Sequence, residues 1–323
     1  MRVPFQALTI FALISATGCG SGKPDSKLGA KTAALPPPAT ADAAVMAVTK
    51  SLSEDKPESI WQALPASYQK DGNDLIAAFA KSCDPDIYNR SFGIAKKLVL
   101  VLQKKKDLII SHPMLAQTGI NSQSLAQNWD GVVNVVSLVV NSELSDLNKV
   151  KTLDVEKFLA VTGSQLMKSA QELAKLAPNA KVDMQASIAS VKATLVKTEG
   201  DTATVKMEVA GEAPQETLFK QVEGRWIPKE MADEWKAGVA RAKANLEKSA
   251  ASSKVENREL TLSQFKMVDG VLDQLLAAKT AEEFNNTVLL GMPMVAGLLG
   301  PLTQLGAPAS GKHAHDEGAP EGK

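Results

Sequence analysis

The fold is decided by the stretch 187–228, which reads SIASVKATLVKTEGDTATVKMEVAGEAPQETLFKQVEGRWIP. In its middle, alternate positions are apolar while most of their neighbours are polar; the apolar positions are Ala203, Val205, Met207 and Val209. A two-residue period of this kind is typical of a half-buried strand. Turn-forming residues divide the stretch at 199–201, 211–214 and 223–224. The sequence therefore predicts a four-stranded antiparallel meander near residues 187–228.

The last of these turns also predicts a register. Glu223-Gly224 is a two-residue hairpin signal, because such turns need residues that tolerate a positive φ. A two-residue turn places Gln221 opposite Trp226, and Phe219 then lies on the same sheet face as Trp226. We therefore expect these two aromatic side chains to lie together.

Helical periodicity flanks this stretch on both sides, because apolar residues recur there every three or four positions. Before the sheet, we expect helices at 41–53, from Pro57 to about Leu64, at 75–83, at 85–110, at 121–141 and at 154–177. After the sheet, one apolar stripe runs through Met231, Trp235 and Val239, and another runs from Leu262 to Leu275. The predicted fold class is α+β, with a predominantly helical chain.

One of these segments admits two interpretations. The β-branched residues of 132–140 favour a strand. In contrast, Asn134, Ser137 and Asn141 fall three and four positions apart, which makes a narrow polar stripe at helical spacing. We expect a deeply buried helix here, with this stripe as its only polar face.

The amino-terminal residues carry an export signal. Arg2 supplies the cationic start, 3–14 form a short apolar core, and 15–18 are small residues of the kind found at a cleavage site. The apolar core is too short to span a bilayer, which needs about 20 apolar residues. The sequence therefore predicts a signal peptide over residues 1–18 and an exported mature chain.

The segment Ala16-Thr17-Gly18-Cys19 resembles the lipobox of bacterial lipoproteins. The resemblance implies a thioether-linked diacylglycerol on Cys19, cleavage after Gly18, and acylation of the new amino group. Gly20 stands where Asp would retain such proteins at the inner membrane, so the periplasmic face of the outer membrane is the favoured location. The alternative is an ordinary secreted protein whose cleavage site falls near a cysteine.

The mature chain divides into three parts. A tether over 19–40 contains Gly, Ser, Lys and three consecutive prolines, a helical body with the inserted sheet covers 41–305, and a polar tail covers 306–323. Within the body, 98–102 is apolar on every side and is flanked by lysines. This block fits a buried helix or a helix on a membrane surface. We expect the buried helix, because an acylated chain needs no second anchor.

The sheet itself carries a second resemblance. The run 200–205 and the segment from Phe219 to Trp226 resemble the terminal meander of NTF2-like lipoproteins. The resemblance covers 188–228 and implies helices packed on a curved antiparallel sheet, often with a pocket between them. No strand is expected among the early helices of this chain, and no functional residue of that family can be matched here.

Composition limits the classes of function. The chain has 36 basic and 36 acidic residues, so it lacks the basic excess of nucleic-acid-binding proteins. Aromatic residues make up 4%, which argues against the aromatic platforms that bind sugars and bases. If Cys19 is acylated, Cys83 has no partner for a disulfide within the chain, and we interpret it as a small buried apolar residue. We expect no cofactor.

Few residues could carry chemistry. Cys83 and His112 could form a nucleophile–base pair, although nothing in their spacing favours one. Asp84 and Asp86 begin like a calcium loop but fit a helix cap better. His313 and His315 could bind a divalent metal weakly from the polar tail, at the entropic cost of ordering it.

These observations leave three hypotheses for function. The first is a non-enzymatic envelope lipoprotein that acts as a structural or protein-binding module. The second is a carrier of a small apolar ligand in a pocket between sheet and helices. That pocket would be lined by Met207, Phe219, Trp226, Met292 and Met294. The third, an enzyme built on Cys83 and His112, is the least favoured.

Overall fold

The computed structural model describes residues 37–117, 122–175, 184–252 and 255–291. Its sheet has four antiparallel strands in the order β1-β2-β3-β4. The strands are β1 (Lys192–Glu199), β2 (Thr202–Glu208), β3 (Gln215–Val222) and β4 (Arg225–Pro228). The prediction of a predominantly helical α+β fold with one antiparallel meander is therefore confirmed. Residues 187–190, however, belong to a short helix, α11 (Met184–Ser190), so the first strand begins later than 187.

The predicted register of the last hairpin is also confirmed. Gln221 pairs with Trp226, and the turn residues Glu223 and Gly224 have φ values of 51° and 75°. Positive φ at both central positions is the geometry that matches the twist of the flanking strands. The first strand has one irregularity, a β-bulge between Leu195 and Lys197.

The helices before the sheet are α1 (Ala41–Ser53), α2 (Glu58–Ala63), α3 (Ala66–Ser82), α4 (Pro85–Lys104), α5 (Lys106–Ile110), α6 (Pro113–Gln117), α7 (Ser122–Val140), α8 (Leu147–Val150), α9 (Val155–Phe158) and α10 (Ser164–Lys175). A 3-10 turn, η2 (Glu143–Ser145), precedes α8, and a π-helical turn, η3 (Leu159–Gly163), joins α9 to α10. After the sheet come α12 (Lys229–Ser252), α13 (Val255–Ala277) and a final helical segment over 281–291.

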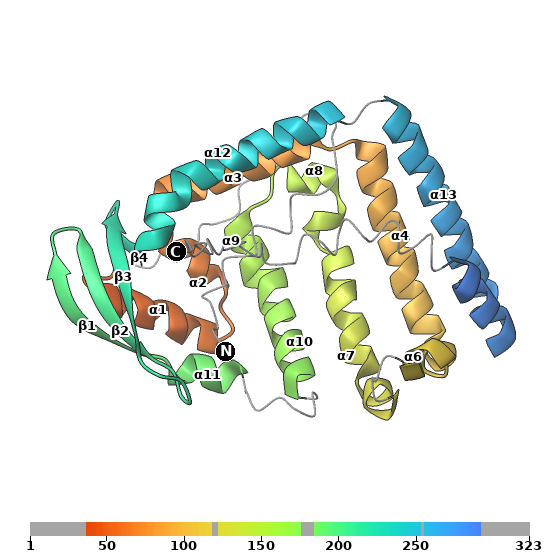
Figure 1. Ribbon diagram of the computed structural model, residues 1–323, viewed down its shortest axis with the longest axis horizontal. Coiled ribbons are helices and arrows are strands. Elements are labelled where there is room, and N and C mark those ends of the chain that lie inside the picture. The colour runs from red at the N-terminus through yellow and green to blue at the C-terminus, as the bar shows by residue number, and fades with distance from the viewer. Residues whose placement is uncertain (1–36, 118–121, 176–183, 253–254, 292–323) are drawn as a thin grey trace, which may run out of the picture.

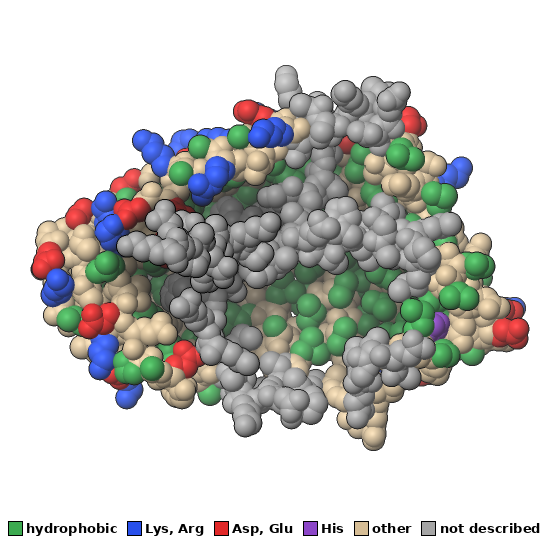
Figure 2. All heavy atoms as spheres, viewed as in Figure 1, with side chains coloured by type: hydrophobic (Ala, Val, Ile, Leu, Met, Phe, Trp, Pro, Cys, Tyr) green, Lys and Arg blue, Asp and Glu red, His purple; other side chains and the backbone are tan. Residues whose placement is uncertain are grey.

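Figure 1 shows how these elements are arranged. The helices α10, α7, α4 and α13 stand side by side in a row, and each contacts the next. The pair α3 and α12 crosses one end of the row, and α12 also reaches β3 and β4. On the same face, Figure 2 shows charged side chains around the sheet and α12, whereas apolar side chains gather in the hollow over α7 and α4.

One face of the sheet is closed by α1. Apolar side chains of β2, β3 and β4 pack against α1 in a single buried cluster. Its members are Ala203 and Val205 of β2, Phe219 of β3, Trp226 of β4, and Ala41, Ala44 and Val45 of α1. This burial explains the alternation in β2, because every second side chain must face the helix. Phe219 and Trp226 share this face, as the turn predicts.

The apolar block 98–102 lies in the middle of the helix row. Val99 and Val101 are buried, Val99 on the side of α7 and Val101 on the side of α13. Leu98 and Leu102 are half-buried, whereas Leu100 is 37% exposed. The prediction of a buried helix is therefore confirmed for the two faces that contact α7 and α13 and is wrong for the face that carries Leu100. The helix was expected to continue to Ile110, but it breaks at Lys105, whose Nζ donates to the carbonyl of Ala278 at 2.6 Å. None of the helices in the described ranges has the length and apolarity needed to cross a membrane.

The start of α4 confirms the capping interpretation of Asp84. Its Oδ1 accepts hydrogen bonds from the backbone N–H groups of Asp86 and Ile87, at 2.9 and 3.0 Å. Its Oδ2 accepts from Nε of Arg258 on α13 at 2.6 Å. Burial raises the pKa of Asp84, but the hydrogen bonds from Ile87 and Arg258 together outweigh burial, so the net pKa lies below the usual range. Asp84 thus ties the start of α4 to α13.

This geometry predicts an acid-sensitive contribution to stability. Because the folded-state pKa of Asp84 is depressed, its contribution is present above the unfolded-state pKa of about 4 and is lost as the pH falls through the folded value. We expect Asp84→Ala to lower the free energy of unfolding at neutral pH by about 1–2 kcal/mol. Urea unfolding of both proteins between neutral and acidic pH measures this difference, which should shrink in acid. Asp74→Asn, which removes only an exposed pair with Lys70, is the control and should leave stability nearly unchanged.

The segment 281–291 approaches α13 closely at a glycine. A Cβ added to Gly291 would lie 2.4 Å from Cγ1 of Val271, a contact that a stiff β-branched side chain cannot relieve. We expect Gly291→Ala to lower the free energy of unfolding by about 1–3 kcal/mol. Gly270→Ala is the matched control, because a Cβ there meets nothing within 4 Å, and it should stabilise α13 by about 0.5–1 kcal/mol. Urea unfolding measures both variants. If the two substitutions changed the free energy of unfolding in the same direction, this packing would be contradicted.

Candidate functional site

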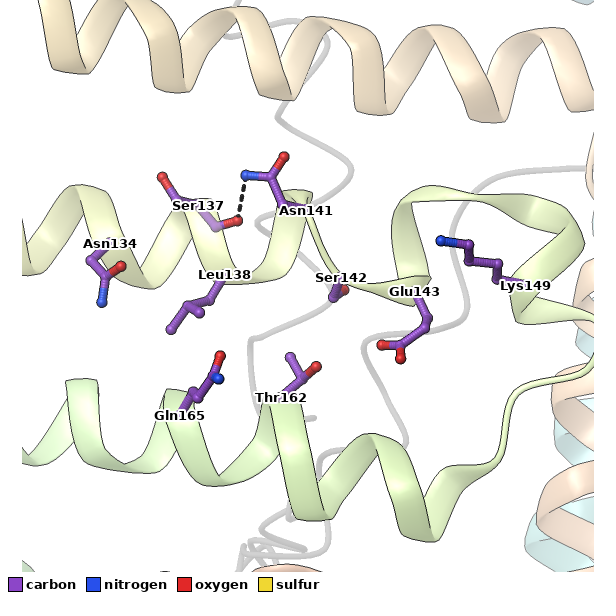
Figure 3. A pocket seen from close by; sticks show the side chains of 9 residues that line it. All are labelled: Asn134, Ser137, Leu138, Asn141, Ser142, Glu143, Lys149, Thr162 and Gln165. Carbon is purple, nitrogen blue, oxygen red and sulfur yellow. Dashed lines mark hydrogen bonds between the residues drawn. The ribbon is translucent and has the colours of Figure 1, made fainter. Parts of the chain in front are cut away.

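A groove of about 400 Å³ lies between α7 and α10, and residues of the short segments η2, α8 and η3 also line it. Figure 3 shows its lining from close by. The lining residues are Asn134, Ser137, Leu138 and Asn141 of α7, Ser142 and Glu143 of the following turn, Lys149 of α8, Thr162 of η3 and Gln165 of α10. All but Leu138 carry a polar or charged group, so the groove is a hydrogen-bonding site.

The α7 side of the groove follows directly from the sequence of that helix. Trp129, Val133 and Val140 are buried in a cluster that also contains Val99 of α4. With these apolar side chains packed on the α4 side, the polar stripe of Asn134, Ser137 and Asn141 lines the groove. The indole Nε1 of Trp129 donates to the carbonyl of Leu102 at 2.9 Å, which fixes α7 against α4.

The opposite side contains a π-helical turn. Asp154 caps α9 by accepting from the backbone N–H of Lys157 at 3.0 Å, which confirms the predicted start of this helix. The helix then widens over η3 and continues as α10. Thr162 of this turn is buried in the wall of the groove. Single π-turns within helices are frequently found at functional sites.

Hydrogen bonds hold several lining side chains in place. The amide Nδ2 of Asn134 donates to Oγ of Ser169 on α10 at 3.2 Å, and Nδ2 of Asn141 donates to the carbonyl of Ser137 at 2.9 Å. The hydroxyl of Ser142 donates to the carbonyl of Val139 at 2.8 Å and accepts from the backbone N–H of Leu144 at 3.2 Å. These contacts leave the carbonyl oxygens of both asparagine side chains available as acceptors within the described structure.

One lining hydroxyl lacks a partner. Oγ of Ser137 is buried and makes no hydrogen bond within the described part of the chain. A second cavity of about 290 Å³, on the α4 side of α7, is also bordered by Ser137 and Asn134, together with Gln103, Trp129, Asp130 and Val133. Ser137 therefore lies where the two hollows meet along α7.

The groove also contains two opposite charges at one end. Figure 3 shows the carboxylate of Glu143 and the ammonium of Lys149 extending into this end without facing each other. Over the described ranges, neither side chain has an ion pair or a hydrogen bond. The arrangement can therefore offer one anionic and one cationic contact, several amides and several hydroxyls to a bound molecule.

The residues predicted for an apolar pocket are placed elsewhere. Met207, Phe219 and Trp226 do come together on one face of the sheet, but α1 packs against that face and the two aromatic side chains are buried in the core. None of the three borders either cavity described above. Met292 and Met294 lie outside the described residues.

The structure does not bring Cys83 and His112 together. Cys83 is buried at the start of α4 with Phe79 and Tyr88, as expected for a small apolar residue. His112 lies beyond the other end of this helix, where its ring packs edge-on to Phe284. Since α4 has 20 residues, its ends are about 30 Å apart. The nucleophile–base hypothesis is therefore wrong for this pair.

The remaining predicted site residues, Cys19, His313 and His315, lie outside the described residues. Within those residues, no group of three or more His, Cys, Asp or Glu side chains is placed to hold a metal ion. Comparison of the chain with protein-family models, curated proteins and solved structures gives no match.

The groove was not among the sites predicted from the sequence. One signal for it was visible: the stripe of Asn134, Ser137 and Asn141 in an otherwise apolar helix. It identified the segment as a helix but did not indicate which residues would face it. Those residues, Thr162 and Gln165, come from a later segment whose pattern is that of an ordinary helix.

Proposed function

We propose that this protein is a lipid-anchored, non-enzymatic module of the bacterial cell envelope that acts by binding. The observation that carries the proposal is the amino-terminal segment, in which a cationic start and a short apolar core lead to Ala16-Thr17-Gly18-Cys19. Acylation at Cys19 would hold the mature chain on a membrane. The favoured location is the periplasmic face of the outer membrane, because Gly20 follows the acylated residue.

The physical basis of such an anchor is additive. Each buried methylene contributes about 0.8 kcal/mol, so a single chain holds a protein marginally and two or more hold it stably. The segment 20–40 between Cys19 and the first helix has 21 residues, which could reach at most about 70 Å. The helical body and its groove would then stand away from the bilayer surface and face the surrounding compartment.

The binding role is supported by the groove between α7 and α10. It is open, of a size that small-molecule sites typically have, and lined by amides, hydroxyls and two charges that have no partner among the described residues. Carriage of an apolar ligand is less well supported, because the predicted pocket residues Phe219 and Trp226 are packed against α1. A structural or protein-binding role in the envelope fits the same location.

The anchor can be tested on the native protein. Cells are grown with an alkyne-bearing fatty acid, and the purified protein is examined for the label and by intact mass spectrometry. We expect the label on a chain that begins at Cys19, with the mass of the acyl groups added. Alkaline carbonate extraction should leave the protein in the membrane pellet. An unlabelled mature chain that appears in the carbonate supernatant would contradict the proposal.

A further inference from the structure

The two charges at one end of the groove do not pair with each other within the described structure. Glu143 and Lys149 line the same groove, and no contact between them is formed. Hydrogen bonds between oppositely charged groups are roughly twice as strong as those between neutral groups. A molecule that carries both charges close together would satisfy both at once, whereas a molecule with one charge would leave the other unpaired.

We propose that this groove binds a free α-amino acid with a hydrogen-bonding side chain. Its ammonium group pairs with the carboxylate of Glu143, and its carboxylate pairs with the ammonium of Lys149. An α-amino acid is the simplest molecule in which these two charges are separated by a single carbon atom. The head group therefore occupies the end of the groove formed by η2 and α8.

The rest of the groove specifies the side chain of the ligand. Beyond the charged end, the lining consists mainly of Asn134, Ser137, Thr162 and Gln165. Side-chain amides both donate and accept hydrogen bonds, so they match amide and hydroxyl groups better than hydrocarbon. Glutamine, asparagine, serine and threonine are amino acids whose side chains meet this requirement without adding a charge.

The buried hydroxyl of Ser137 gives an independent reason for a polar ligand. An unpaired buried hydroxyl is costly, and native structures satisfy nearly all such groups with protein, water or ligand. Within the described structure Ser137 Oγ has no partner. Because this oxygen has almost no solvent-exposed surface, an amide side chain that extends along α7 would provide that partner once the Ser137 side chain rotates toward the groove.

The groove has the dimensions that such a ligand requires. Its volume of about 400 Å³ lies at the lower end of the range for small-molecule sites. The lining contains no aromatic residue. An aromatic platform would favour a sugar ring, and its absence from this lining favours recognition through charges and amides instead.

Isothermal titration calorimetry on the purified full-length protein tests the inference with three probes, L-glutamine, L-asparagine and L-serine. We expect saturable binding of at least one. For that probe, the analogue with an acetylated amino group and the analogue with an amidated carboxyl group should each bind at least about tenfold more weakly, since each lacks one charge-assisted contact. L-Leucine should also bind more weakly.

Two substitutions test the assigned contacts, and two others control for charge. Glu143→Gln and Lys149→Gln should each weaken binding of the probe by about tenfold or more. Glu234→Gln and Lys236→Gln change exposed, unpaired charges on α12 and should leave binding unchanged. All four positions are at the surface or rim, so we expect the variants to fold, which thermal unfolding checks.

Several results would overturn the inference: no saturable binding of any of the three probes, equal binding of the blocked analogues or of L-leucine, binding of D-glucose in their place, or unchanged affinity in both groove variants. The inference does not depend on the lipid anchor. A protein that lacks acylation yet binds the probe would overturn only the proposed location, and an acylated protein that binds none of the probes would overturn only the ligand.

Discussion

Replacement of Cys19 by alanine should move this protein out of the membrane fraction. The thioether that would carry the diacylglycerol needs the thiol of Cys19, and the resemblance to lipoproteins implies that cleavage after Gly18 follows this modification. Without it, the anchoring free energy of two or more acyl chains is lost, at about 0.8 kcal/mol per methylene. We expect the variant to lose the fatty acyl label completely and to appear in carbonate supernatants, or as a precursor that retains residues 1–18.

Cys83→Ala is the matched control, because it removes the other cysteine of the chain. Cys83 is buried in the cluster at the start of α4 and has no access to the acylating enzymes in the folded protein. Its replacement should leave both the label and the membrane fractionation unchanged. If the Cys19 variant still pelleted after carbonate extraction and the native protein carried no acyl mass, the proposed location would be wrong.

The largest expected loss of stability comes from Phe219→Ala. Phe219 is 3% exposed, pairs with Ala203 on β2 and Pro228 on β4, and packs in the cluster between the sheet and α1. Truncation to alanine removes the aromatic ring and its buried contacts. It leaves a cavity between the sheet and α1 that the flanking strands cannot close. We expect the free energy of unfolding to fall by about 3–5 kcal/mol.

The neighbouring residue on the same strand provides the control for this prediction. Leu218 is 48% exposed and points to the opposite side of β3. Leu218→Ala should change the free energy of unfolding by about 0.5 kcal/mol or less, as exposed substitutions usually do. Urea denaturation followed by circular dichroism measures both variants. Equal losses in the two would mean that the assignment of sheet faces is wrong.

Several features of the fold could be predicted because they depend on neighbouring residues alone. The alternation through Val205 identified β2, and the turn at Glu223-Gly224 fixed the pairing of Gln221 with Trp226. Asp84 could be recognised as a helix cap because capping requires only the next few backbone N–H groups. In each case, the chain contains both partners of the interaction within a few positions.

The candidate site could not be predicted in the same way. The stripe through Ser137 indicated a polar face on α7, but the residues opposite it belong to η3 and α10. The π-helical turn over 159–163 has no distinct sequence pattern, and at the break the side chain of Lys105 contacts Ala278, which lies 173 positions later in the chain. The mispredicted pocket at Phe219 has the same origin, since nothing in the strand indicated that α1 would cover it.

The sequence by itself determined most of the segments that are helices or strands, the alternation of β2, and how the last hairpin is paired. Only the tertiary structure decided which element covers each apolar face and which polar side chains meet in the groove of Glu143 and Lys149. The physical reason is that the hydrophobic effect is non-directional: it drives an apolar face to be buried but does not select the partner that buries it. The partner is selected by the close packing of the whole chain.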